Sequence, residues 1–202
     1  MGAVRAMRDN SWSSYYDASK SVDPPRGTLV HALDAWERPP GIAIDLGCGA
    51  GRDTLALLAA GWHVHALDAE PEALARLEAL VPTDWRDRLT PILGRFETAE
   101  LPPADLVNAS FALPFCPPAA FPGLWRAISA SLRPGGILSG QLFGDRDTWA
   151  ANKWMTFHAA VEVKALLAGW EKLVLEDCEW DGMPAVGPAK HWHVFHVVAR
   201  RP

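Results

Sequence analysis

The sequence predicts an α/β protein in which a mostly parallel β-sheet is covered by helices on both faces. Short apolar runs alternate with amphipathic helical patterns along nearly the whole chain of 202 residues, as in sheets built from strand–helix–strand units with right-handed crossovers. A glycine-rich loop follows the first run, and no linker rich in Pro, Gly or Ser divides the chain. We therefore expect a single domain, with residues 1–38 as an N-terminal lid and helix segment and 39–202 as the core.

The first helical pattern covers Thr28–Trp36, which is amphipathic and lies between two proline pairs. The segment Gly41–Leu46 reads GIAIDL, a short and mostly apolar run that is typical of a buried strand. Arg52–Ala60 follows as a helix with its leucines on one face, and Gly61 is a common helix stop. These elements form the first strand–loop–helix unit.

The next unit begins with the strand Trp62–Leu67, which closes on Asp68. Pro71–Leu80 follows as a helix, with proline in the first turn where its missing N–H is tolerated. Leu89–Leu93 and Ala104–Ser110 are apolar runs that indicate the third and fourth strands. Strands and helices therefore continue to alternate.

The second half of the chain completes the sheet. Ala119–Ser131 is expected as a helix because its apolar residues recur at helical spacing. Arg133–Gly136 then turns the chain into a fifth strand, Ile137–Phe143, and a further helix covers His158–Ala168. The turn-rich sequence DGMPAVGP predicts an antiparallel hairpin between the last two strands, Trp170–Trp180 and His191–Ala199.

Composition narrows the class of partner. The formal net charge is −5 and no basic stripe is present, which argues against nucleic acid and against an anionic membrane surface. The three cysteines are scattered without zinc spacing, and neither a signal peptide nor a membrane-spanning run is found. We therefore expect a cytoplasmic monomer or homodimer that acts on a small molecule and binds neither nucleic acid nor membrane.

The loop Gly47–Gly51 joins the first strand to a helix N-terminus, whose N–H groups suit a carboxylate or a phosphate. On geometry alone it can serve NAD, FAD or S-adenosylmethionine. A dinucleotide fingerprint needs a third glycine where this chain has Arg52. Asp45, near the strand end, can meet an ammonium group but would repel a pyrophosphate. Asp68 can accept hydrogen bonds from ribose hydroxyls, which fits any adenosine cofactor.

The stretch AIDLGCGAGRDT resembles motif I of class I S-adenosylmethionine-dependent methyltransferases. HALDAEPEAL, ADLVNASFALPF and SLRPGGIL resemble the later motifs in the right order, over about Gly41 to Leu142. The chain is most similar to small single-domain bacterial members related to the tellurite-resistance and thiopurine methyltransferases. This resemblance implies a Rossmann-like three-layer sandwich with a seven-stranded, mostly parallel sheet of order 3-2-1-4-5-7-6 and strand 7 antiparallel.

The resemblance also implies that S-adenosylmethionine is the cofactor. Asp45, Gly47 and Gly49 would lie at its methionine end, Asp68 at the ribose and Ala69 beside the adenine. Where many members have an acid after the third strand, this chain has Arg95. The Phe96 backbone or the Glu97 side chain is expected to take its place; a solvated Glu97 and a core Phe96 are the alternative. The remaining expected cofactor contacts are Cys48, Arg52, Asn108 and Tyr16.

Aromatic residues are frequent. The ten tryptophans are either large core and rim residues or, in part, the lining of an aromatic ligand pocket. Trp12, Tyr15 and Tyr16 precede the first helix. By analogy with methyltransferases of this shape, this segment would fold over the cofactor as a lid that excludes water. A tail with stray aromatic residues is the alternative.

The acceptor is expected where strands 4 and 5 end and strand 7 begins. On strand 7, His191 and His193 share one face, and Lys190 and Trp192 share the other. Either histidine can act as general base at neutral pH, or both are packed, hydrogen-bonded side chains. Arg146 would fix a polar or anionic acceptor, or pair with the aspartate beside it. No third ligand accompanies the His–x–His pair, so no metal is expected.

The leading hypothesis is S-adenosylmethionine-dependent methyl transfer to a sulfur, selenium, tellurium, nitrogen or oxygen atom of a small molecule. The transfer would be an in-line displacement that needs no metal. One alternative is a non-catalytic S-adenosylmethionine-binding module that regulates a partner. A nicotinamide-dependent oxidoreductase is a further alternative, disfavoured by Asp45 and Arg52.

Overall fold

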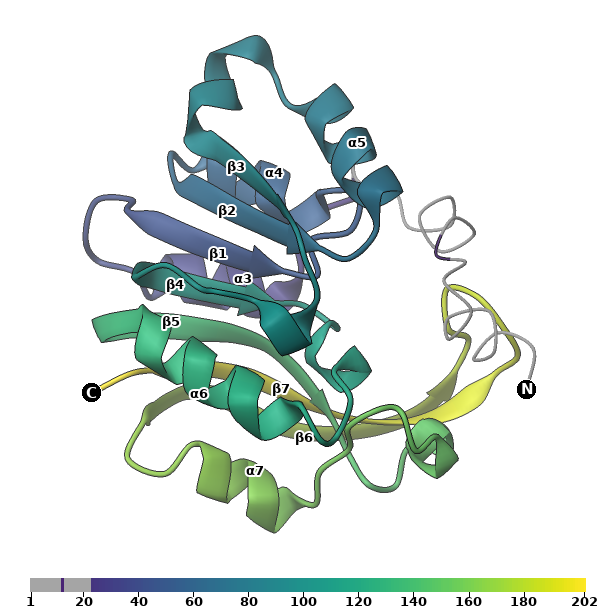
Figure 1. Cartoon of the computed structure of the whole chain (residues 1–202). Coiled ribbons are helices and arrows are strands. Elements are labelled where there is room, and N and C mark those ends of the chain that lie inside the picture. The colour runs from purple at the N-terminus through teal and green to yellow at the C-terminus, as the bar shows by residue number, and fades with distance from the viewer. Residues whose placement is uncertain (1–11, 13–22) are drawn as a thin grey trace.

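The computed structural model describes Trp12 and residues 23–202. Its sheet has seven strands in the order β3-β2-β1-β4-β5-β7-β6 (Figure 1). Strand β7 is antiparallel to both β5 and β6, whereas β1 to β5 pair in parallel. The expected order and direction are confirmed. The strands are β1 (Ile42–Leu46), β2 (His63–Asp68), β3 (Leu89–Leu93), β4 (Ala104–Ala109), β5 (Leu132–Phe143), β6 (Glu171–Gly182) and β7 (Lys190–Arg200).

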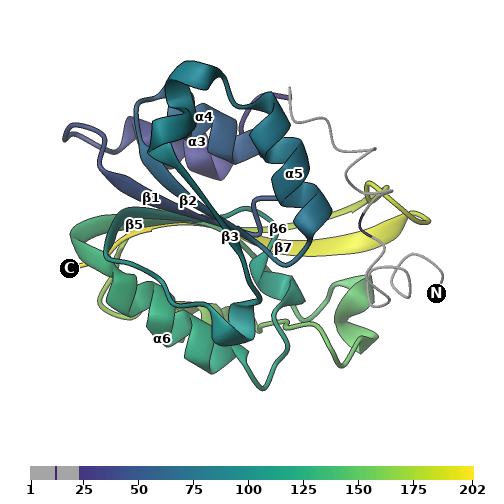
Figure 2. The same ribbon diagram turned by 45° about the horizontal axis from the view of Figure 1, so that its top comes forward.

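Helices cover both faces of the sheet, as the alternating pattern predicted (Figure 2). Helices α3, α4 and α5 bury Leu29, Leu57 and Leu77 in one core on one face, and α6 and α7 pack on the other. The α-helices are α3 (Gly27–Asp34), α4 (Arg52–Ala59), α5 (Pro71–Leu80), α6 (Phe121–Ser131) and α7 (Ala160–Leu166). The 3-10 helices are η1 (Thr83–Arg88), η2 (Phe96–Thr98), η3 (Leu113–Phe115) and η4 (Thr148–Ala151).

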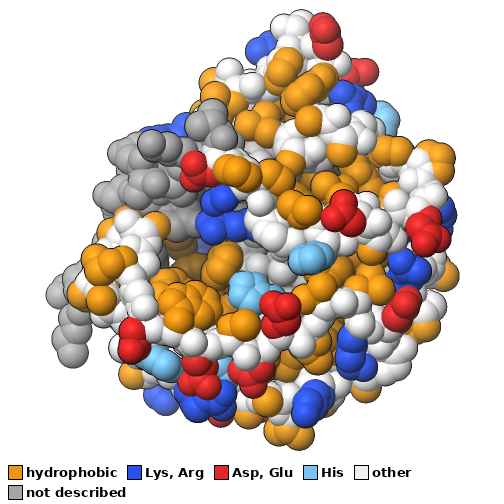
Figure 3. Space-filling model, turned by 180° about the vertical axis from the view of Figure 1, so that it is seen from behind, with side chains coloured by type: hydrophobic (Ala, Val, Ile, Leu, Met, Phe, Trp, Pro, Cys, Tyr) orange, Lys and Arg blue, Asp and Glu red, His pale blue; other side chains and the backbone are white. Residues whose placement is uncertain are grey.

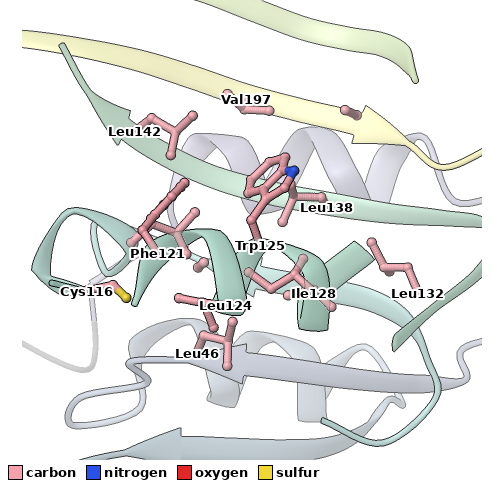
Figure 4. Packing of buried hydrophobic residues seen from close by; sticks show 14 of the residues in the cluster. Leu46, Cys116, Phe121, Leu124, Trp125, Ile128, Leu132, Leu138, Leu142 and Val197 are labelled. Carbon is pink, nitrogen blue, oxygen red and sulfur yellow. The ribbon is translucent and has the colours of Figure 1, made fainter. Parts of the chain in front are cut away.

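The core on the α6 side joins both halves of the sheet. Leu124 of α6 lies beside Leu46 of β1, and Trp125 lies beside Leu138 of β5 (Figure 4). Each fully buried apolar side chain of this size contributes about 1.5–3 kcal/mol relative to exposure. This packing holds the ends of β1, β4 and β5 in fixed relative positions.

The start of β5 differs from the sequence expectation. Arg133–Gly136 was expected as a turn before the strand, but β5 already begins at Leu132. Leu132 pairs with Ala104, and the next pair joins Ile137 to Leu106, so the four residues between form a bulge. The Arg133 guanidinium donates to the Asp105 carboxylate at 2.8 Å, which ties the bulge to β4. The segment that contains Gly135 and Gly136 is therefore a bulge within β5 and not a turn before it.

The N-terminal helix α3 lies on the sheet. Leu29 is buried and Gln141 of β5 donates a hydrogen bond to Thr28 at 3.0 Å. Within the proposed 1–38 segment, this helix is thus part of the core packing, whereas the lid candidates Tyr15 and Tyr16 lie outside the described residues. No described helix has the length and apolar character that crossing a membrane requires.

Candidate functional site

A cavity of about 500 Å³ lies where the carboxyl ends of the parallel strands meet the start of β7. This is the edge at which open α/β sheets bind ligands. The loops after β1, β2 and β3 form one side, and the segments around β4 to β7 form the other. Its lining residues are Trp12, Arg26, Gly47, Gly49, Asp68, Ala69, Glu70, Gly94, Arg95, Phe96, Glu97, Ser110, Phe111, Ala112, Phe115, Pro117, Phe143, Trp149, Trp154, Trp180, Met183, Pro184, Ala185 and Trp192.

The glycine loop keeps the floor of the cavity open. Gly47 has φ +67°, and a Cβ there would come within 2.6 Å of the Ala112 Cβ. Gly51 has φ +96°, and a Cβ there would lie 2.4 Å from Cδ1 of Leu77. Both positions need the left-handed backbone that only glycine adopts freely. A side chain at Gly47 would also point toward Phe96 of the cavity wall.

Asp68 links the glycine loop to the end of β2. One carboxylate oxygen accepts a hydrogen bond from the Gly49 N–H at 2.8 Å, and the other accepts from the Glu70 N–H at 3.0 Å. Asp68 is 8% exposed and lines the cavity together with Ala69. A carboxylate fixed at this place in the cavity lining suits hydrogen bonds from the two hydroxyls of a ribose.

An acidic, hydrogen-bonded cluster lies beneath the loop. Asp45 accepts from the Thr54 hydroxyl at 2.6 Å and from the Asn108 amide at 2.8 Å. The same Asn108 nitrogen donates to Asp53 at 3.0 Å. Burial and the charge of Asp53 raise the pKa of Asp45 to about 7. The cluster joins β1, the start of α4 and β4.

Two expected contacts are therefore corrected. We expected Asp45 and Asn108 to contact the ligand. Neither is among the described residues that line the cavity. Asp45 is 2% exposed and Asn108 is completely buried, because each satisfies the other's polar atoms. They support the glycine loop and add negative charge beneath it. Sequence reasoning missed Asp53 and Thr54, although both stand in the GRDT continuation of the loop.

Cys48 and Arg52 also differ from expectation. Neither is among the described lining residues. The Cys48 side chain is buried, and its backbone N–H donates to the Leu67 carbonyl at 3.0 Å. The Arg52 guanidinium turns outward and donates to the Pro24 carbonyl at 2.6 Å. Arg52 thus fixes the chain before α3.

The loop after β3 lies at the cavity as expected. Gly94, Arg95, Phe96 and Glu97 all line it, on the same side as Ala69. The Glu97 side chain and the Phe96 backbone are thus near the place where the adenine was expected. The structure also adds Glu70, which the sequence reasoning did not select.

The other side of the cavity is aromatic. Five of the ten tryptophans line the cavity. Their positions agree with the expectation that some of the tryptophans line an aromatic pocket. The indoles of Trp180 and Trp192 stack with ring centroids 5.7 Å apart and an interplanar angle of 11°. Trp12 packs edge-on against Phe115 at 5.0 Å, so the N-terminal segment contributes to the cavity through this residue.

Comparisons with known proteins agree with this geometry. Residues 43–136 match a family described as Methyltransferase domain. An uncharacterized methyltransferase of Synechocystis sp. is 36% identical over 100 residues, covering 48% of this chain and 44% of that protein. A carboxy-S-adenosyl-L-methionine synthase of Geobacter metallireducens is 33% identical over 100 residues, covering 46% and 41%. The matches thus span less than half the length of these curated relatives.

Solved structures share the fold over nearly the whole chain. TehB from Haemophilus influenzae superposes with a TM-score of 0.76 and 19% identity, covering 96% of this chain and 66% of that one. The 1,6-didemethyltoxoflavin-N1-methyltransferase of Burkholderia thailandensis, solved with 1,6-didemethyltoxoflavin and S-adenosylhomocysteine bound, has a TM-score of 0.66 and 23% identity and covers 99% and 89%. Residues 43–136 thus match a methyltransferase domain, and the whole described chain has the fold that the sequence resemblance implied.

The candidate bases His191 and His193 are not among the described residues that line the cavity. His191 contacts Glu179 and Asp181, each at 2.9 Å, and His193 contacts Asp177 at 2.8 Å. The cavity face of β7 instead carries Trp192. The alternation of side chains along β7 therefore turns both histidines away from the acceptor. The packed, hydrogen-bonded alternative describes them, and we do not propose either as a general base.

Arg146 is the centre of a charged cluster on the same face of the β6–β7 hairpin. Its guanidinium donates to Glu179 at 2.7 Å, approaches the His193 Nε2 atom at 3.0 Å and lies 3.6 Å from Asp177. Figure 3 shows acidic, basic and histidine side chains next to one another low on the molecule seen from behind. Hydrogen bonds from Arg146 and His191 lower the pKa of Glu179 to about 2. Arg146 thus stabilises the hairpin and does not reach the cavity.

The same cluster contains a group with metal-ligand chemistry. Asp177, Glu179 and His193 each place one ligand atom within 4.8 Å of the others. The Arg146 guanidinium lies between them and contacts both Glu179 and His193. The positive charge beside these groups is therefore supplied by an arginine of the protein. These residues therefore form an arginine-centred ion-pair network.

The pKa of Asp45 predicts how cofactor affinity depends on pH. With a pKa near 7, Asp45 is largely protonated below pH 7 in the free domain. A nearby sulfonium or ammonium charge favours the ionised form, so binding should release a proton and tighten as pH rises. We expect the dissociation constant of S-adenosylmethionine to fall several-fold between pH 6 and 8, approaching about tenfold per pH unit at most for one proton.

Calorimetric titration at several pH values measures this dependence. Asp45→Asn should remove most of it, whereas Asp34→Asn on the exposed side of α3 should leave it unchanged. An equally steep dependence in the Asp45→Asn variant would contradict the assignment.

Proposed function

We propose that this protein transfers the methyl group of S-adenosylmethionine to a small-molecule acceptor, without a metal ion. The observation that supports this most strongly is a cavity of about 500 Å³ whose lining extends from Gly49 and Asp68 to the aromatic side at Trp192. Pockets of roughly 300–1,000 Å³ hold small ligands. One cavity can therefore hold the cofactor and a small acceptor next to each other.

The residues of the chain fit this cofactor. Gly47 lines the cavity with a left-handed backbone and no side chain, which lets a ligand approach the main chain, and Asp68 supplies a fixed carboxylate for the ribose. Bound S-adenosylmethionine supplies an electrophilic methyl group on a positively charged sulfur. The protein's part is to align the acceptor with this methyl group and to exclude water. Carboxylates beneath and beside the loop, Asp45, Asp53 and Asp68, complement the positive charge of the cofactor.

The acceptor atom is sulfur, selenium, tellurium, nitrogen or oxygen in this proposal. The fold is compatible with several acceptors, because TehB, the 1,6-didemethyltoxoflavin-N1-methyltransferase named above and the glycopeptide N-methyltransferase MtfA all share it. MtfA aligns with a TM-score of 0.60 at 20% identity. These likenesses concern the fold, so the cavity itself must distinguish the acceptors.

A transfer assay with S-adenosylmethionine labelled at the methyl group tests the proposal. The acceptors offered would be thiols, selenite, tellurite, amines and phenols, and the labelled product would be detected after extraction. We expect label to move to at least one class. Tight S-adenosylmethionine binding with no transfer to any class would contradict the proposal and favour the non-catalytic binding module. Binding of NADH without S-adenosylmethionine binding would favour the oxidoreductase.

A further inference from the structure

The acceptor side of the cavity is a continuous wall of rings from separate segments. Trp192 of β7 contacts Trp180 of β6, Trp149 of η4 and Phe143 of β5, with centroids 5.7, 5.5 and 5.7 Å apart. Phe111, after β4, lies 6.2 Å from Phe143 and extends the wall toward the glycine loop. We call Phe111, Phe143, Trp149, Trp180 and Trp192 the aromatic wall.

This wall lies opposite the polar side of the cavity. The sheet order places β3, β2 and β1 on one side of β4, and β5, β7 and β6 on the other. The lining carboxylates Asp68, Glu70 and Glu97 follow β2 and β3, on the side that fits the adenosine. The sheet topology therefore separates a polar cofactor side from an aromatic acceptor side.

Polar groups are scarce on the acceptor side. Among the described lining residues there, only Arg26 and Ser110 have polar side chains apart from the indole N–H groups. The Ser110 hydroxyl donates to Asn108 at 3.2 Å, and the Arg26 guanidinium lies 5.0 Å above the ring of Phe111. A serine hydroxyl and a guanidinium do not have the chemistry of a general base. The described lining of the acceptor side therefore favours an acceptor whose reacting atom is already nucleophilic.

Aromatic cavities often bind cations, but this wall already has cations of the protein beside it. The Lys190 ammonium lies 3.9 Å from the ring centroids of both Trp149 and Trp192 and is paired with Asp147. Arg26 adds a second positive charge at Phe111. A cationic acceptor would therefore meet positive charge next to these rings.

A small oxyanion is disfavoured for a different reason. Anions such as tellurite or selenite are strongly hydrated, and burying them requires several hydrogen-bond donors. The acceptor side offers mostly ring faces, with Arg26 as its basic side chain among the described residues. Flat apolar ring faces complement another flat ring by stacking.

We propose, on the basis of the function proposed above, that the acceptor is a planar aromatic or heteroaromatic molecule, neutral or anionic, that stacks on the aromatic wall. It reacts through an atom with a free lone pair at neutral pH, such as an aromatic thiolate, a phenolate of low pKa or a ring nitrogen. This lone pair forms the new bond to the methyl carbon as the sulfur–methyl bond breaks. The electron pair of the broken bond stays on the sulfur, and no proton passes to the protein.

A panel of four acceptors tests this inference with the full chain and saturating S-adenosylmethionine. The panel contains 4-nitrothiophenol as ionised aromatic, 2-mercaptoethanol as aliphatic thiol, tellurite as oxyanion and phenethylamine as aromatic cation. We expect kcat/KM for the aromatic thiolate to exceed that for each of the others by about tenfold or more. Equal or faster transfer to 2-mercaptoethanol, tellurite or phenethylamine would overturn the inference while leaving the proposed function intact. No transfer to 4-nitrothiophenol, when the wider acceptor screen described above finds a non-aromatic acceptor, would overturn the inference alone. No transfer in either experiment would contradict both.

Variants of the aromatic wall test the same inference in a second way. Trp180→Leu, on the partly exposed hairpin, and Trp192→Leu should each raise KM for the aromatic acceptor by about tenfold, with the dissociation constant of S-adenosylmethionine unchanged. Trp85→Leu is the matched control because this half-buried tryptophan lies in η1, before β3, and does not line the cavity. An unchanged KM in Trp180→Leu, whose fold is least at risk, would overturn stacking on the wall.

Discussion

Replacing Asp68 with alanine is expected to weaken S-adenosylmethionine binding by about 1.5–3 kcal/mol, which is roughly 10- to 150-fold in dissociation constant. Two losses contribute. The carboxylate can no longer accept hydrogen bonds from the ribose, and the N–H groups of Gly49 and Glu70 lose their acceptor. Isothermal titration calorimetry measures the change directly.

Matched variants separate these two losses. Asp68→Asn keeps an acceptor oxygen for one of the backbone N–H groups but removes the charge, so it should fall between the wild type and Asp68→Ala. Glu78→Ala, near the exposed end of α5, should leave the affinity unchanged. If Asp68→Ala binds S-adenosylmethionine as tightly as the wild type, Asp68 does not hold the ribose.

Replacing Lys190 with methionine is expected to destabilise the fold by about 3–5 kcal/mol. Lys190 and Asp147 are 5% and 3% exposed and form a buried ion pair. Burial lowers the pKa of Lys190 to about 8, although its hydrogen bond to Asp147 opposes this shift. Without the ammonium, the Asp147 carboxylate stays buried with only the N–H groups of Trp149 and His193 as donors. Urea unfolding at neutral pH gives the difference in free energy.

The double variant and a surface pair serve as controls. Asp147→Asn combined with Lys190→Met removes both charges and should recover part of the loss. Arg76→Ala breaks the exposed pair with Glu72 on α5 and should change the free energy of unfolding by less than about 1 kcal/mol. Equal stability of Lys190→Met and wild type would show that the ion pair does not hold η4 against β7.

Much of the cofactor side was predictable because its signals are local in sequence. The glycine loop, the aspartate at the end of β2 and the loop after β3 each follow a strand, and parallel strands bring their carboxyl ends to one edge. Gly47, Asp68, Ala69, Phe96 and Glu97 accordingly lie at the cavity. The resemblance to class I methyltransferases supplied the strand order, which periodicity alone cannot specify.

The buried cluster and the acceptor side depended on contacts distant in sequence. The Asn108 amide donates a hydrogen bond to Asp45, which lies 63 positions earlier in the sequence. The sequence pattern identified both as polar residues near the site, but it did not show that they bind each other beneath it. The alternation along β7 correctly separated His191 and His193 from Trp192. It did not show which face borders the cavity, because that depends on the twist of the β6–β7 hairpin and on η4.

The sequence by itself determined the class of the fold and the glycine loop, because the residues that set backbone conformation and strand ends are local in the chain. Its resemblance to class I methyltransferases predicted the methyl donor. Only the tertiary structure decided which side chains meet the acceptor. Trp149 of η4 and Trp192 of β7 both contact Phe143 of β5, and Trp180 of β6 stacks on Trp192. The charged residues of the hairpin pair around Arg146 on the opposite face. Removing aromatic rings from water is favourable, which suits them to the cavity side. Burying charged side chains is costly, so they lie on the opposite face, in contact with solvent.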